Sequence, residues 1–209
     1  MRNSVITKKI QGAMAPNAVL QDLLEGNARY VANNLTGTNV PELVKLTTGG
    51  QFPKAVILSC IDSRVPVEMV FDQTIGDVFV ARVAGNFENV DILGSMEYSC
   101  KVAGSKLVFV LGHESCGAVK AACDGVELGN ITALLANIIP AVKLASEQVE
   151  GVTDSSNPAF VAKTVENNVK LSIERIREKS PILAEMEKNG EITIVGGVYS
   201  LQTGKVTLL

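Results

Sequence analysis

The chain has 209 residues, 46% of them hydrophobic and 20% charged, which is enough for one folded domain with its own core. Its formal net charge of −3 excludes the basic excess typical of nucleic-acid-binding domains. No apolar run approaches ~18 residues, so we expect no transmembrane helix and no membrane partner. Residues 1–16 lack the apolar segment of a signal peptide, although a leader removed earlier would leave no trace here. Four cysteines are too few for a disulfide scaffold, and we therefore expect a reducing, cytoplasmic setting.

Helices are predicted where apolar residues recur at spacings of three and four. Residues 1–15 show no clear period and are expected to form an arm. The apolar stripe from Val19 to Val31 predicts a helix opened by Pro16, and the loop-like stretch 35–53 leaves room for a short helix over 43–46. Further helices are predicted over residues 66–71, 88–102, 115–123, 130–150, 154–179 and 181–188. Pro140 should kink or break one of them, and the Asp154-Ser155-Ser156 cluster should cap the next.

Strands are predicted from short apolar runs bounded by turn residues. They cover residues 55–59, 77–83, 106–111, 191–195 and 205–208. The first four alternate with helices, which predicts a parallel sheet, and the last should pair with its predecessor as a hairpin. We therefore predict a single α/β domain over residues 1–209, with a mostly parallel central sheet flanked by helices and a C-terminal antiparallel strand. Residues 1–34 would form the N-terminal arm and helix, and residues 54–209 the metal-binding core.

Three metal-capable side chains follow two of these strands. Cys60 comes directly after the strand over 55–59, and His113 and Cys116 follow the strand over 106–111. Parallel sheets bind ligands at the carboxyl ends of neighbouring strands, so these residues should meet. Two thiolates and one imidazole are a zinc-type set that leaves one tetrahedral position open, which is more typical of catalysis than of scaffolding. The helix starting near Ser115 should favour a thiolate at Cys116.

A plainer interpretation of the same residues is a core histidine with buried thiols, because free cysteine buries readily. The remaining two cysteines, Cys100 and Cys123, lie on apolar helical faces and are interpreted as core residues rather than ligands.

Asp62 and Arg64 stand two residues apart in the loop after Cys60. An arginine fork on a carboxylate keeps the carboxylate ionised and oriented as an acceptor. The pair is either an ordinary loop ion pair or a catalytic dyad in which Asp62 orients a metal-bound hydroxide. Asp62 is also close enough in sequence to Cys60 to become a fourth metal ligand, which would close the site.

The segments CIDSR, residues 60–64, and GHESCG, residues 112–117, together resemble the β-class carbonic anhydrases. The resemblance runs from residues 23–30 to residues 196–200. It implies a mostly parallel α/β fold, zinc held by Cys60, His113 and Cys116, and a dyad of Asp62 and Arg64. It also implies a homodimer or tetramer with active sites at the dimer interface and an N-terminal arm that embraces the partner.

Further residues gain roles only through this resemblance. Gln51 resembles a glutamine that hydrogen-bonds the substrate, and Phe79 and Tyr98 match aromatic residues that line the pocket. Without the family, Gln51 is a loop residue and Phe79 a strand core residue. Backbone turns of the family are matched by Val65, Gly85 and Gly117.

A second site of the family is expected to be missing. Some bacterial members carry a non-catalytic bicarbonate site that uses a tryptophan, and Ile57 stands at that position here. Arg82 and Tyr199 resemble the other two members of that site. We therefore expect the inhibitory site to be absent or weak, and the enzyme to stay open.

The resemblance thus predicts zinc-dependent, reversible hydration of carbon dioxide to bicarbonate and a proton by attack of zinc-bound hydroxide. Phe79, Val83 and Ile61 would supply an apolar wall for the small substrate. The only histidine is committed to zinc, so proton export should depend on external buffer or on a group such as Tyr98. The alternatives are hydrolysis of carbonyl sulfide or carbon disulfide at the same site and a non-catalytic structural-zinc module. A cysteine hydrolase using Cys116 and His113 would leave Cys60 unexplained.

Overall fold

Five strands form one sheet in the order β2-β1-β3-β4-β5, in a computed structural model that describes residues 2–209. The strands are β1 (Ala55–Ser59), β2 (Val78–Arg82), β3 (Leu107–His113), β4 (Thr193–Tyr199) and β5 (Val206–Leu208). The first four are parallel, and β5 runs antiparallel to β4. In the register, Ser59 lies beside both Arg82 and Leu111, so the segments after β1, β2 and β3 leave the sheet at one edge.

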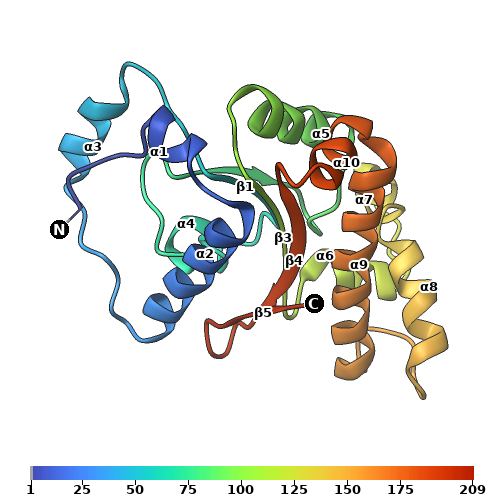
Figure 1. The fold of residues 1–209 in the computed structure, drawn as a ribbon. Helices are drawn as coiled ribbons and strands as arrows, with labels where there is room; N and C mark the ends of the chain where they lie inside the picture. The colour runs from blue at the N-terminus through green and yellow to red at the C-terminus, as the bar shows by residue number, and fades with distance from the viewer. Residues whose placement is uncertain (1) are drawn as a thin grey trace.

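The two central strands are apolar throughout because the sheet is covered on both faces. Every residue of β1 and β3 is buried. Alternate residues point to opposite faces: Ile57 and Phe109 pack toward α2 (Pro16–Val31) and α4 (Val67–Val70), whereas Leu58 and Val110 pack toward the other helical layer. That second layer contains α5 (Val90–Glu97), α9 (Pro158–Lys179) and α10 (Pro181–Lys188). Figure 1 shows the sheet between these two groups of helices.

Two glycines of the sheet face α9 and allow the helix to pack close against it. A Cβ atom on Gly112 or Gly196 would stand 2.6 or 2.5 Å from methyl groups of Val169. Of the shorter helices, α6 (Gly117–Cys123) and α8 (Ile139–Gln148) pack against α9, and α7 (Gly129–Leu135) packs against α6. At the other side of the sheet, α1 (Lys8–Gly12) and α3 (Val40–Thr47) lie near α2 (Figure 1).

The predicted fold class is confirmed: one α/β domain with a mostly parallel sheet flanked by helices and a C-terminal antiparallel strand pair. The division at residues 34 and 54 stays a prediction. Both β3 and β4 extend beyond their predicted ends, because the ladder continues through the pairs Gly112–Val198 and His113–Tyr199. Glycines and a histidine interrupt the apolar pattern there, so the sequence underestimates the strands.

Helix boundaries differ from the predictions where caps decide them. Residues 130–150 form two helices, α7 and α8, bent by 54° at their break, and Pro140 lies in the first turn of α8. The next helix, α9, begins at Pro158, and its cap is Asn157, whose side chain accepts from the N–H groups of Ala159 and Phe160. Asp154 instead accepts hydrogen bonds from Ser156, within the preceding turn.

Other local differences are small. The arm over residues 1–15 contains the short helix α1, capped by Thr7, and the helix expected over 43–46 extends over α3. The helix predicted over 88–102 consists of α5 followed by a π-helical turn, η1 (Tyr98–Val102).

Within residues 2–209, no single helix is both long and apolar enough to cross a membrane. The bent pair of α7 and α8 meets the length and composition criterion only when the two helices are taken together.

Candidate metal centre

Three side chains meet at the carboxyl edge of the sheet, and they come from two segments that are 53 residues apart in sequence. Cys60 follows β1, His113 ends β3, and Cys116 caps the N-terminus of α6. Their candidate ligand atoms all lie within 4.8 Å of one another, and the Sγ atoms of Cys60 and Cys116 are 3.9 Å apart. All three residues are buried. The structure therefore brings together the three residues that the sequence singles out as ligands.

The spacing and the hydrogen bonds fit a tetrahedral metal ion. Two thiolates on a tetrahedral zinc, each ~2.3 Å from the ion, lie about 3.8 Å apart, close to the observed separation. The Nδ1 atom of His113 contacts the backbone carbonyl of Glu114 at 2.8 Å, so it carries the proton and leaves Nε2 as the ligand atom. Nε2 is buried and finds no hydrogen-bond partner among the described residues. An orphaned buried nitrogen beside two thiols is the arrangement expected of a metal ligand.

The charges of the two thiols also favour a cation. A hydrogen bond from Cys116 lowers the pKa of Cys60 to about 4, and Cys60 in turn raises the pKa of Cys116. One proton is thus shared between the two sulfur atoms, because two adjacent buried thiolates would repel. A divalent cation removes this repulsion and allows both thiols to ionise.

Asp62 lies beside this cluster and is held by Arg64. The Nε and Nη2 atoms of Arg64 donate to the two carboxylate oxygens at 3.0 and 2.7 Å, and the Arg64 backbone N–H donates at 2.9 Å. The side-chain hydrogen bonds from Arg64 are the largest cause that lowers the pKa of Asp62 to about 2. The nearer carboxylate oxygen is 3.9 Å from Nε2 of His113. Asp62 is thus an ionised acceptor that faces the cluster while bonded to arginine.

Two residues hold the loop that carries Cys60 and Asp62, through hydrogen bonds that the sequence alone does not reveal. Arg82, at the end of β2, donates from Nε to the carbonyl of Cys60 and from Nη2 to the carbonyl of Asp62, both at 2.8 Å. Gly85 donates its N–H to Sγ of Cys60 at 3.4 Å. The resemblance named both residues, but only the pairing of β1 with β2 gives them these roles. Their one sequence signal is their place at, or shortly after, the end of β2, the strand beside β1.

The substrate-contact residues expected from the resemblance are more dispersed. Gly117 directly follows Cys116 at the start of α6. Gln51 is exposed and lies four residues before β1, at the opposite end of that strand from Cys60. The rings of Phe79 and Tyr98 pack edge to face, with centroids 6.3 Å apart, along an open groove that none of the three candidate ligands lines. Within one chain, Gln51, Phe79 and Tyr98 are therefore not brought to the cluster.

The remaining sequence candidates lie in varied surroundings. Ile57 is fully buried and packs in the core between the sheet and α2. Tyr199 is also buried, and its hydroxyl lies 3.2 Å from that of Tyr30. Of the proposed apolar wall, Val83 packs beside the cluster's hydrophobic surroundings, whereas Ile61 is 62% exposed.

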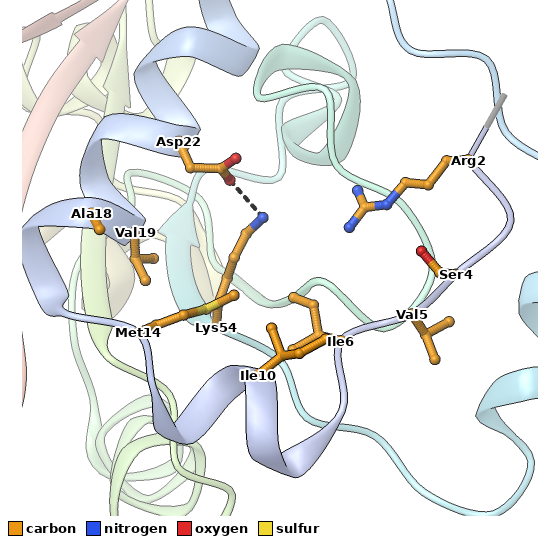
Figure 2. Close-up of a pocket in the computed structure, with 10 residues that line it drawn as sticks. All are labelled: Arg2, Ser4, Val5, Ile6, Ile10, Met14, Ala18, Val19, Asp22 and Lys54. Carbon is orange, nitrogen blue, oxygen red and sulfur yellow. Dashed lines mark ion pairs between the residues drawn. The ribbon is translucent and has the colours of Figure 1, made fainter.

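A separate cavity of about 320 Å³ opens at the amino end of β1, away from the cluster. Figure 2 shows Lys54 and Arg2 pointing into it. Each of these cations already has a partner: Lys54 lies 2.6 Å from Asp22, and Arg2 makes two hydrogen bonds to Asp77. The charges in this cavity are thus balanced within the chain.

Comparisons with known proteins agree with the site. A sequence model of the carbonic anhydrase family matches residues 55–206. A relative from Mycobacterium tuberculosis, Carbonic anhydrase 2, is 34% identical over 200 residues, which are 92% of each chain. The solved β-carbonic anhydrase of Coccomyxa is 26% identical with a TM-score of 0.73, over 91% of this chain and 86% of that one. A tetrameric β-carbonic anhydrase of Sordaria macrospora shares the fold, with 24% identity and a TM-score of 0.72 over 92% and 97% of the two chains.

The fold is a mostly parallel α/β sheet with two thiols and an imidazole at its carboxyl edge, and the family model matches most of the chain. Together these findings define an enzyme family: the chain belongs to the carbonic anhydrases. Within that family, its fold and its structural neighbours place it in the β class.

Proposed function

We propose that this chain catalyses the zinc-dependent, reversible hydration of carbon dioxide to bicarbonate and a proton. The observation that carries the proposal is the geometry of four residues. Cys60, His113 and Cys116 offer three converging ligand atoms, while Asp62 stands beside them, 3.9 Å from Nε2 of His113. The Mycobacterium relative, Carbonic anhydrase 2, supports the same reaction.

Zinc held by these three residues would supply a Lewis acid that acidifies a coordinated water, as in the carbonic anhydrases that use three histidines. The chain's own groups then decide how the nucleophile is oriented. Asp62 is ionised and can only accept a hydrogen bond, so it selects a nucleophile whose O–H points toward the carboxylate. Arg64 holds the carboxylate by both oxygens and thereby keeps it off the metal position. This is why we favour a catalytic, open site over a permanent fourth ligand.

Proton export must use a route other than histidine. The single histidine of the chain is a candidate ligand, with its Nδ1 atom already engaged by Glu114. We therefore propose that the proton leaves to external buffer, or through a group such as Tyr98. Rates that rise with buffer concentration to a plateau would support this, and rates independent of buffer would contradict it.

We also propose that the working enzyme is a homodimer or a larger oligomer. Within one chain, the cluster is not reached by Gln51, Phe79 or Tyr98. The open groove lies beside β2, which is the outermost strand of the sheet. A second copy could bring these residues to the first chain's cluster and add a partly apolar wall for carbon dioxide. The Sordaria protein named above is tetrameric.

Complementation tests the shared site. Chains carrying Asp62→Asn and chains carrying Gln51→Ala are each expected to be nearly inactive. If each site uses both chains, mixing them after mild dissociation should restore about a quarter of native activity, because half of random dimers are mixed and each has one intact site. Mixtures no more active than their parents would contradict the shared site.

All four cysteines are free, which suits a reducing compartment, and we propose a cytoplasmic location on that ground.

The proposed reaction is tested by stopped-flow hydration of carbon dioxide with a pH indicator from pH 6.5 to 9, alongside zinc content. One zinc per chain with activity throughout this range would support the open site. Activity confined to high pH would indicate that Asp62 binds the metal at lower pH. Zinc without hydration at any pH would favour hydrolysis of carbonyl sulfide or carbon disulfide, or a structural role. Assays with those two sulfur substrates separate the last outcomes.

A further inference from the structure

The loop of residues 84–88 contacts a candidate ligand from outside the ligand motifs. Gly85 lies 25 positions beyond Cys60 in sequence, and its N–H donates to the Cys60 sulfur. An N–H that points at a thiolate withdraws electron density from sulfur and thus from any metal that the sulfur binds.

One face of α9 anchors this loop residue by residue. Asn168 donates from its side-chain amide to the carbonyl of Gly85 at 2.7 Å, and Ser172 donates to the carbonyl of Asn86 at 3.4 Å. One and two turns further along, Arg175 and Lys179 form ion pairs with the buried carboxylate of Glu88 at 3.3 and 2.8 Å. The four helix residues recur at spacings of four, three and four, which place them on one face of α9.

The backbone of the loop takes a conformation that few residue types adopt. Gly85 and Asn86 have φ angles of +83° and +44°, in the left-handed region that glycine and asparagine tolerate best. A Cβ atom at Gly85 would stand 2.5 Å from the Cδ1 atom of Ile138, so a larger residue there would require both backbone strain and a shift of Ile138. Asn168, which is 1% exposed, supplies the shortest of the contacts to the loop and acts at the glycine that faces Cys60.

We propose that Asn168 is a positioning residue for the metal centre. By binding the carbonyl of Gly85, it holds the adjacent N–H of Gly85 toward the sulfur of Cys60 and thereby limits how much charge the thiolate donates to the metal. The inference deepens the proposed function, because it rests on Cys60 being a ligand of the zinc. It extends the metal centre from the ends of the strands to the middle of α9.

The test replaces Asn168 by leucine, which has a similar shape but no donor. The matched control is Asn167→Leu. Asn167 is the neighbouring buried asparagine on the same helix, but it donates to Gln148 on α8 instead. Both proteins are loaded with cobalt(II), since zinc is spectroscopically silent, and the thiolate-to-cobalt charge-transfer band is recorded. Affinity for cobalt is measured by competition with a chelator.

In Asn168→Leu we expect the charge-transfer band to move to lower energy, because a thiolate without its hydrogen bond donates charge more easily. We also expect cobalt to bind about tenfold more weakly, because the sulfur of Cys60 is then no longer held in position and this loss outweighs its stronger donation. Asn167→Leu should match the native protein in both respects. A native-like band and affinity in folded Asn168→Leu would overturn the proposal, as would equal changes in both variants.

A measurement on the unmutated chain keeps the proposal testable if the variant does not fold. With cadmium-113 bound, a scalar coupling between the metal and the amide proton of Gly85 reports the N–H···S hydrogen bond directly. An absent coupling would overturn the proposal, and a present one would support it. If the native protein binds neither cobalt nor cadmium through thiolates, the proposed metal site itself fails, which distinguishes that failure from a failure of the role of Asn168.

Discussion

Replacing Arg64 by methionine tests whether the arginine holds Asp62 away from the metal. Methionine keeps much of the side-chain stem but removes two charge-assisted hydrogen bonds, at 3.0 and 2.7 Å. Arg64 is 54% exposed, so solvent screens these bonds and they hold the carboxylate less strongly than buried bonds would. Because the geometry is bidentate, the balance between a carboxylate bound to arginine and one turned toward the metal should still shift by roughly three- to tenfold.

Stopped-flow hydration at neutral pH should therefore show kcat/KM reduced by roughly that factor in Arg64→Met, with zinc content unchanged because the three ligands remain. Arg177→Met is the control. Arg177 on α9 holds Glu187 on α10 by two similar hydrogen bonds and is 43% exposed, but this pair lies away from the cluster. Activity of Arg64→Met within twofold of native would refute the reasoning. Loss of zinc together with activity would assign Arg64 to the integrity of the loop instead.

Three further predictions concern pH, metal and core. Because the pKa of Asp62 is lowered to about 2 in the folded protein, its carboxylate should stabilise the native state above pH ~4 and lose that contribution as the pH falls from ~4 to ~2. Asp62→Asn should therefore have a lower Tm than the native protein at pH 6, and this difference in Tm should be smaller at pH 2.5. A difference in Tm that is the same at both pH values would contradict this. In a protein equilibrated with free zinc at 1,000 times the Kd for zinc, chelation should lower the free energy of unfolding by about 4 kcal/mol, which is roughly 8–16 °C in Tm by calorimetry. His113→Ala should show no such effect of the chelator. Phe109→Ala removes a fully buried ring that packs edge-on against Phe71, with ring centroids 5.3 Å apart. The free energy of unfolding should therefore fall by about 3–5 kcal/mol in urea titrations. A loss under ~1 kcal/mol would mean that the core there repacks.

The segments whose pattern is local were predicted well from sequence. The run Ala55-Val56-Ile57-Leu58 is apolar at every position, which only a strand covered on both faces requires, and β1 has the predicted bounds. Helix ends were predicted less well, because Asn157 rather than the neighbouring Asp154 cluster caps α9. Several residues near that turn have cap-forming side chains, and the packing of the helix selects among them.

The clustering of the candidate ligands could be inferred from the sequence because of a regularity of parallel sheets. Cys60 and His113 each follow an apolar strand, and carboxyl ends of neighbouring parallel strands share one edge, so their meeting needed only the topology. The dispersal of Gln51, Phe79 and Tyr98 was not foreseeable in this way. Their expected roles came from resemblance, and resemblance does not state which chain of an oligomer supplies a residue.

The sequence by itself determined the kind of fold and which residues form the candidate site, because apolar periodicity and the types of metal-capable residue are properties of short segments. Only the tertiary structure decided what surrounds that site. The hold of Arg82 on the backbone of Cys60, and the link from Asn168 through Gly85 to the same sulfur, join residues 22 or more positions apart. Such contacts depend on strand register and helix placement, which arise from packing the whole chain and leave no local pattern in the sequence.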